Sequence, residues 1–111
     1  MKRWTGWESA RHQVTLAGRV LGANERPIPG AEVTIIRMPE AFQRRIAAGA
    51  SGQFLARFDG LYYFVDLPAG RYTLKARDGR SGAEAEKTVS VSWGKDGKAN
   101  LAVADLTLVR H

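Results

Sequence analysis

Apolar and polar side chains alternate along much of the chain. In residues 13–20, every second residue from Val14 onwards is apolar or small, and residues 71–77 repeat the pattern from Tyr72 onwards. A period of two is typical of a strand with one buried and one exposed face. Both segments are therefore predicted to be half-buried strands, with Val14 and Tyr72 facing inwards.

Shorter runs of the same kind complete a set of seven predicted strands. These strands cover residues 13–20, 31–36, 54–58, 61–65, 71–77, 84–93 and 100–109. The connections are too short for crossover helices, so the pattern predicts an all-β sandwich built as an antiparallel meander. In the last strand the apolar phase shifts between Val103 and Leu106, which predicts a bulge around Ala104-Asp105. In residues 54–58 we expect Phe54 and Phe58 to lie on one side of the strand.

Asp-Gly pairs occur between several of the predicted strands. They occur at Asp59-Gly60, Asp78-Gly79 and Asp96-Gly97. Asp-Gly between apolar runs favours a two-residue hairpin of type I′, in which both central residues have positive φ. Each pair is therefore expected to join two neighbouring antiparallel strands.

One segment, residues 37–53, departs from the strand pattern. Pro39 suits a first helical turn, and Phe42 and Ile46 are four residues apart, so a short helix is predicted near residues 39–49. This insertion is either a flap over the core or a docking element. Phe42, Arg44 and Arg45 are its candidate partner-binding residues, since loops often carry function.

The first residues form a second candidate binding element. We expect residues 1–12 to be an N-terminal tail and residues 13–109 to form the domain. Trp4, Trp7 and Arg11 lie in this tail, and tryptophan and arginine dominate interface hot spots. The alternative is that the tail folds back onto its own sandwich.

Composition narrows the classes of protein that fit. The chain has 111 residues, enough for one core, and no cysteine, which excludes disulfides and thiolate chemistry. No apolar run follows the basic start, so we expect a cytoplasmic protein, or one incorporated into an exported particle. The net charge is +6, but the cations are scattered, so nucleic acid is a less favoured partner than protein.

Several stretches resemble the carboxypeptidase regulatory-like domain, a transthyretin-like (prealbumin-like) sandwich. They are Gly18-Arg19-Val20, then Arg26-Pro27-Ile28-Pro29-Gly30-Ala31-Glu32-Val33, the run from Asp59-Gly60-Leu61-Tyr62 to Tyr72-Thr73-Leu74, and the closing Asp105-Leu106-Thr107-Leu108. The resemblance implies a seven-stranded Greek-key β-sandwich. It also implies structural roles, with Tyr62, Phe64, Leu67 and Tyr72 in the core.

The relatives that this resemblance implies include one enzyme, the hydrolase that opens 5-hydroxyisourate. That enzyme uses histidines, an arginine and a C-terminal Tyr-Arg-Gly-Ser, whereas this chain ends Leu108-Val109-Arg110-His111. No metal-ligand pattern such as His-x-x-Glu occurs, and no cofactor is expected. We therefore expect a non-enzymatic interaction or assembly module; transthyretin-like domains also decorate contractile injection particles. The alternatives are a glycan- or nucleic-acid-binding module and, less favoured, the hydrolase.

Overall fold

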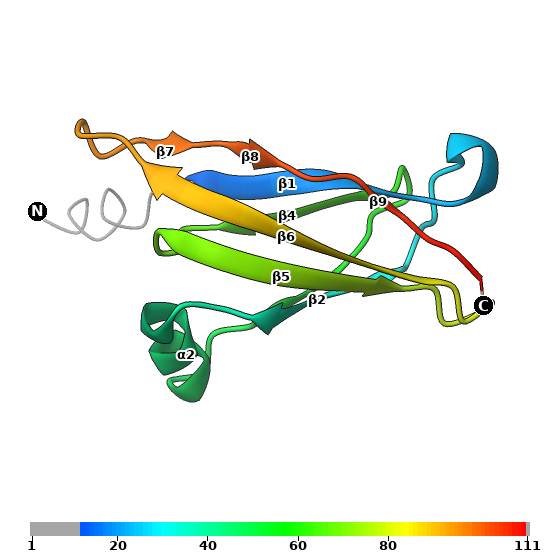
Figure 1. Ribbon diagram of the computed structural model, residues 1–111, viewed down its shortest axis with the longest axis horizontal. Helices are drawn as coiled ribbons and strands as arrows, with labels where there is room; N and C mark the ends of the chain where they lie inside the picture. Colours follow the sequence, from blue (N-terminus) through cyan, green and yellow to red (C-terminus); the bar gives the residue numbers. More distant parts are fainter. Residues whose placement is uncertain (1–11, 111) are drawn as a thin grey trace, which may run out of the picture.

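Residues 12–110 are described by the computed structural model and form two packed β-sheets (Figure 1). The small sheet contains β4 (Leu61–Val65), β1 (Val14–Leu21) and β8 (Ala102–Val103), with β9 (Leu106–Thr107) also paired to β1. The large sheet has the order β3 (Gln53–Leu55), β2 (Glu32–Arg37), β5 (Gly70–Arg77), β6 (Glu84–Trp93) and β7 (Ala99–Asn100). The predicted all-β sandwich is confirmed.

The last predicted strand is divided among both sheets. β7 pairs antiparallel with β6, whereas β8 and β9 pair with β1 in parallel. The break between β8 and β9 falls at Ala104-Asp105, where the phase shift predicted an irregularity. The parallel pairing corrects the simple antiparallel meander: the chain leaves the large sheet after β7 and returns beside its own first strand.

The start of β1 corrects the predicted inner face. Val14 is 41% exposed, whereas Thr15 is fully buried. The register of β1 against β4 shifts between Val14 and Leu16, and this bulge turns Thr15 inwards. The Thr15 hydroxyl donates to the Phe64 carbonyl and accepts from the Leu67 amide, both at 3.2 Å, so the buried oxygen is satisfied.

Two of the three Asp-Gly pairs join paired strands, as predicted. Asp78-Gly79 lies between β5 and β6, and Asp96-Gly97 lies between β6 and β7; both strand pairs are antiparallel. The type I′ geometry is wrong, because Gly97 has φ +80° while Asp96 keeps a negative φ. The Asp96 carboxylate instead accepts from the Lys98 amide at 3.0 Å, which stabilises the turn through a side chain.

The third pair, Asp59-Gly60, does not form a hairpin. β3 pairs with β2 and β4 pairs with β1, so this turn carries the chain from the large sheet to the small one. Phe58, expected on the same side as Phe54, is 80% exposed, while Phe54 packs against the core. Local turn chemistry was sufficient to place a turn here but not to choose the sheet that follows.

The interior between the sheets is apolar. The four side chains that the family resemblance assigns to the core are all buried: Tyr62, Phe64, Leu67 and Tyr72. The Tyr62 hydroxyl donates to the Ala104 carbonyl, and the Tyr72 hydroxyl donates to the Pro68 carbonyl at 2.5 Å. Both buried phenols therefore keep a partner, as stable cores require.

The predicted helix is present as α2 (Glu40–Ala47), which begins directly after Pro39. Arg44 and Arg45 occupy its last turn, where cations interact favourably with the helix dipole. A short 3₁₀ turn, η1 (Ala23–Glu25), lies in the loop after β1. Within residues 12–110, neither helix has the length and apolar character needed to cross a membrane. Figure 1 places α2 at the end of the molecule where the described chain begins.

Candidate binding surfaces

The insertion covers the core with its one large aromatic side chain. Phe42 is only 4% exposed, and its ring meets that of Tyr72 edge-on at 5.9 Å and 68°. An edge-to-face pair of this kind adds to the stabilisation that burial gives. We therefore remove Phe42 from the candidate partner-binding residues, because its surface is already used inside the fold; α2 acts at this point as a flap.

Arg45 ties the insertion to the start of the domain. Its Nη1 donates to the Asp66 carbonyl at 2.5 Å, while the Asp66 carboxylate accepts from the Gln13 amide at 3.0 Å. His12 Nδ1 lies 2.5 Å from the other carboxylate oxygen. Burial raises the pKa of Asp66, but the Gln13 and His12 hydrogen bonds and the His12 and Arg45 charges outweigh it and lower that pKa below its ordinary value. This cluster fastens three segments together.

The other candidate residues divide into two groups. Arg44 is exposed and lies 3.3 Å from Glu40 on the same helix, a pairing that leaves most of its surface open. Trp4, Trp7 and Arg11 lie outside the described residues, so their role in partner binding stays a prediction.

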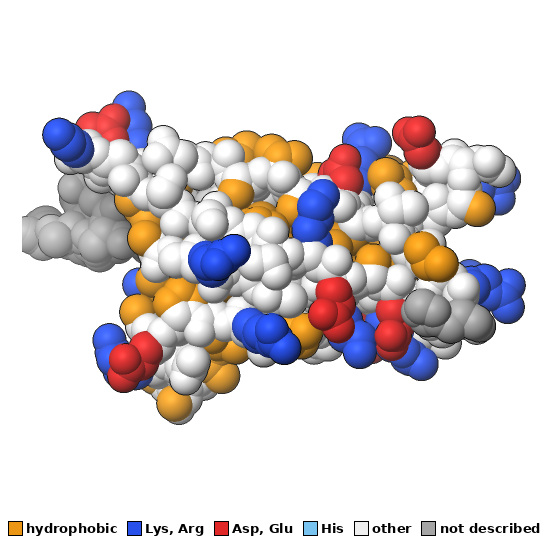
Figure 2. Space-filling model, viewed as in Figure 1, with side chains coloured by type: hydrophobic (Ala, Val, Ile, Leu, Met, Phe, Trp, Pro, Cys, Tyr) orange, Lys and Arg blue, Asp and Glu red, His pale blue; other side chains and the backbone are white. Residues whose placement is uncertain are grey.

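The outer face of the small sheet carries a group of neighbouring apolar side chains. In register, Tyr63 pairs with Ala17, and Ala17 pairs with Val103 on the other side. Beside this row, Val14 pairs with Val65. Val103 is 69% exposed, and Val14 and Val65 are also exposed. We call these five residues the apolar face; Figure 2 shows hydrophobic side chains gathered over β8 at its edge.

The outer face of the large sheet is mostly polar, although Leu55 on its edge strand and Ile36 in β2 are exposed. One row across its three central strands is Thr34, Lys75 and Glu86, and the hydroxyls of Thr73 and Thr88 lie 2.9 Å apart. Charged side chains of both signs are interspersed over β5 and β6 (Figure 2). Such cross-strand pairs suit a face that remains in water.

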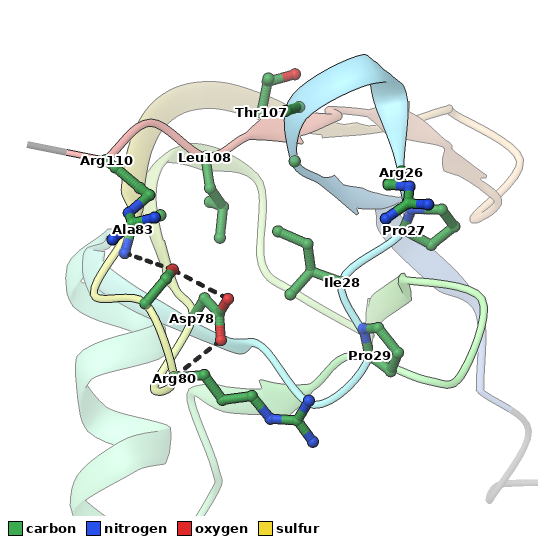
Figure 3. A pocket seen from close by; sticks show the side chains of 13 residues that line it. Arg26, Pro27, Ile28, Pro29, Asp78, Arg80, Ala83, Thr107, Leu108 and Arg110 are labelled. Atoms are coloured by element: carbon green, nitrogen blue, oxygen red, sulfur yellow. Dashed lines mark hydrogen bonds between the residues drawn. The ribbon is translucent and has the colours of Figure 1, made fainter.

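A groove opens at the end of the sandwich opposite α2. Its volume is about 750 Å³, and three segments far apart in sequence form it: residues 22–29, 78–83 and 107–110. The side chains of Ile28 and Leu108 point toward each other across its middle, and Pro27 and Pro29 form one wall (Figure 3). The floor of the groove is therefore apolar.

Three arginines stand around this floor: Arg26, Arg80 and Arg110 (Figure 3). The groove also contains Asp78, but its carboxylate accepts from the Arg80 amide at 3.0 Å and from the Ser81 hydroxyl at 3.1 Å. Its role is thus to shape the turn between β5 and β6. We call this site the arginine groove.

The described residues offer no ready metal centre. Within residues 12–110, no group of three or more histidine, aspartate or glutamate side chains converges in a way that could hold a metal ion. The acidic turn residues bind backbone amides instead; Asp59, for example, accepts from the Leu61 amide at 3.1 Å.

Sequence reasoning missed both surfaces. The apolar face was missed because the bulge turns Val14 outwards and because its other residues come from three strands that only the fold brings together. The arginine groove was hidden because its cations lie in three separate segments and have no characteristic spacing. Arg26-Pro27 in a proline-rich loop was the one available signal, since prolines fix a loop in a single conformation.

Comparison with known proteins agrees with this architecture. A search of curated proteins found no match. A solved structure of the major pilin subunit of Bacillus cereus (D312A variant) is similar in fold, with a TM-score of 0.54, 14% sequence identity and 88% of this chain covered. The chain corresponds to 29% of that pilin's length. The profile of the carboxypeptidase regulatory-like domain matches residues 15–104, from the first strand to the break before β9. With most of its length matched, the chain belongs to the carboxypeptidase regulatory-like domain family.

Proposed function

We propose that this domain is a non-catalytic interaction module that binds another protein through the apolar face. The proposal is carried by the difference between the two outer faces: Tyr63, Ala17 and Val103 form an apolar row on one, while the row Thr34, Lys75 and Glu86 on the other is polar. Contiguous exposed apolar surface marks interaction sites on soluble domains, whereas scattered single residues do not.

The favoured occupant is an acidic protein with an apolar contact surface. The chain carries a net charge of +6, so two copies repel each other on approach. Arg19 is exposed in the row next to the apolar face, where it pairs in register with Leu61. A cation at the rim favours a partner with carboxylates at the matching positions and disfavours self-association.

A more specific role is proposed on family grounds. Transthyretin-like domains occur on contractile injection particles, and the similar pilin structure is itself an assembly subunit. We propose that this domain is a subunit or adaptor of such a particle, made in the cytoplasm and built into the assembly. The support is family likeness, and fold alone does not fix function.

Site-specific photocrosslinking tests the proposed face. A photoreactive phenylalanine analogue placed at Val103 should crosslink to one protein in host extract, and the same analogue at Thr88 on the polar face should not. Val103→Asp should abolish co-purification of that protein, whereas Thr88→Asp should leave it unchanged. Equal crosslinking from both positions would contradict the proposal, and a shift to a self-crosslinked dimer would identify a second copy as the occupant.

The N-terminal segment needs a separate test. Deleting residues 1–11 should leave thermal unfolding nearly unchanged, because the core residues lie between Leu16 and Leu108. If Trp4, Trp7 and Arg11 contribute to binding, the deletion will weaken co-purification of the crosslinked partner. Unchanged co-purification would remove the segment from the interface.

A further inference from the structure

The arginine groove is a second binding site, distinct from the apolar face. We propose that it binds an acidic peptide segment of a partner protein, with carboxylates paired to Arg26, Arg80 and Arg110 and an apolar side chain placed between Ile28 and Leu108. This inference does not depend on the apolar face, since none of the five residues of that face lines the groove.

The three arginines are available for an anionic ligand. Within residues 12–110, none of their guanidinium groups lies within ion-pair distance of a carboxylate. Asp78, the one acid of the lining, directs its carboxylate to the Arg80 amide and the Ser81 hydroxyl. A guanidinium presents donors in a fixed fork that matches a carboxylate, so such a rim selects for acidic groups.

The floor distinguishes a peptide from a small inorganic anion. Ile28, Ala83 and Leu108 give the groove an apolar base, which an inorganic anion would leave uncovered. A volume of about 750 Å³ is also far larger than phosphate needs and falls in the range of sites for drug-sized ligands. A segment that alternates acidic and apolar side chains satisfies both the rim and the floor.

The proline wall of the groove lies next to the turn between β3 and β4. The backbone at Gly60 lies against Pro27, because a Cβ placed there would be 3.1 Å from the Pro27 Cβ. Phe58, two residues earlier, is 80% exposed. The turn that carries Phe58 therefore adjoins the proline wall.

Nucleic acid fits this site less well. Sequence-tolerant binding of single strands combines cations with aromatic rings on which bases stack. The lining of the groove contains arginines, prolines and aliphatic side chains but no aromatic ring. The combination of cations with an aliphatic floor is more suited to a peptide with acidic and aliphatic side chains.

Selection from a random peptide library tests the proposal. Phage displaying peptides of about eight residues would be selected on the immobilised full chain, and the enriched sequence would be titrated as a fluorescein-labelled peptide by fluorescence polarisation. We expect enrichment of alternating acidic and aliphatic residues. Arg80→Ala and Arg26→Ala should each weaken binding of that peptide by about tenfold, as expected for loss of a charge-assisted hydrogen bond.

Matched variants separate this site from the rest of the surface. Arg44→Ala removes the same charge on α2 and should leave the affinity unchanged, and so should Val103→Asp. Conversely, Arg80→Ala should leave crosslinking at position 103 intact, so the two proposals can fail independently. Lack of acidic enrichment, an unchanged affinity in both groove variants, or equal competition by inorganic phosphate or a single-stranded oligonucleotide would overturn the proposal.

Discussion

The two outer faces of this sandwich are built from similar half-buried strands but carry opposite chemistry. On the large sheet, the Glu84 carboxylate lies 3.6 Å from both Lys75 and Arg77. On the small sheet, the equivalent outward positions include Ala17 and Val103, which have no polar group to offer water. Exposed cross-strand pairs each contribute only about 0.2–1 kcal/mol, so the polar face is explained mainly by its contact with water. The comparison teaches that the side chains of one face suit contact with water, whereas the other face leaves apolar side chains exposed to it.

The two sheets also differ in how their strands are held. β5 and β6 are paired over eight successive residues from Gly70 to Arg77. By contrast, β8 and β9 each pair with β1 over only two residues. The small sheet therefore depends more on individual contacts around Ala104, and substitutions there should have larger effects than matched substitutions on the large sheet.

The largest effect is expected from Gly18→Ala. A Cβ at this position would lie 1.9 Å from the Ala104 carbonyl oxygen, so β1 and the segment after β8 could not keep their spacing. We expect a loss of about 3 kcal/mol in the free energy of unfolding, measured by urea denaturation. Ala17→Val, on the outer face next to it, should change stability by less than about 0.5 kcal/mol. Wild-type stability of the Gly18 variant would show that Ala104 does not pack against β1.

A matched pair of threonines compares the two sheets directly. Thr15→Val leaves the Leu67 amide without its buried acceptor, which should cost about 2 kcal/mol. Thr73→Val removes a hydroxyl whose partner, Thr88, is exposed and can bond to water, so its cost should be below about 1 kcal/mol. Both values come from urea denaturation, and equal losses would remove the distinction drawn between the sheets.

Alkaline unfolding tests the large sheet's contact with the core. Burial raises the pKa of Tyr72 to about 12, although the Arg45 charge opposes this. Because this pKa is higher in the folded state, the protonated phenol stabilises the fold fully below the unfolded pKa of about 10. This contribution to the free energy of unfolding is lost as the pH rises toward about 12. Stability should fall by about 1 kcal/mol more in wild type than in Tyr72→Phe between about pH 10 and pH 11. Parallel curves for the two proteins would show that this phenol is not buried.

The smallest effect is expected from Asp66→Asn, at the corner after β4. The lowered pKa of this carboxyl means that its contribution is present above the unfolded pKa of about 3.9 and is lost as the pH falls through the folded value. Asparagine tolerates the positive φ of 56° at this position, so the backbone is not the cause of any change. The variant should melt slightly below wild type at about pH 6, and the difference should vanish near about pH 2. A difference that persists in acid would contradict the charge-based explanation.

Most of the fold could be predicted because the alternation of side chains is a local property. It placed β5 from Tyr72, Leu74 and Ala76, and the three Asp-Gly pairs correctly marked turns. It failed where distant segments decide: which sheet receives the chain after Asp59-Gly60, and where a bulge turns Thr15 inwards.

The binding surfaces were less predictable for the same reason. The sequence around an isolated aromatic residue such as Phe42 does not show whether its side chain enters the core or contacts a partner. Arg26, Arg80 and Arg110 come together only after both sheets have closed, so their shared position is a property of the fold and not of any local motif.

The parallel placement of β1 beside β8 and β9 has a mechanical consequence. In Figure 1 the described chain enters at one end of the long axis and leaves at the other, and these strands run side by side between the two ends. Tension applied through residues 12 and 110 therefore acts along the strands, so the hydrogen bonds joining them share the load together. A domain pulled along its paired strands resists extension more than a domain pulled across them, because in the second case the hydrogen bonds break one after another.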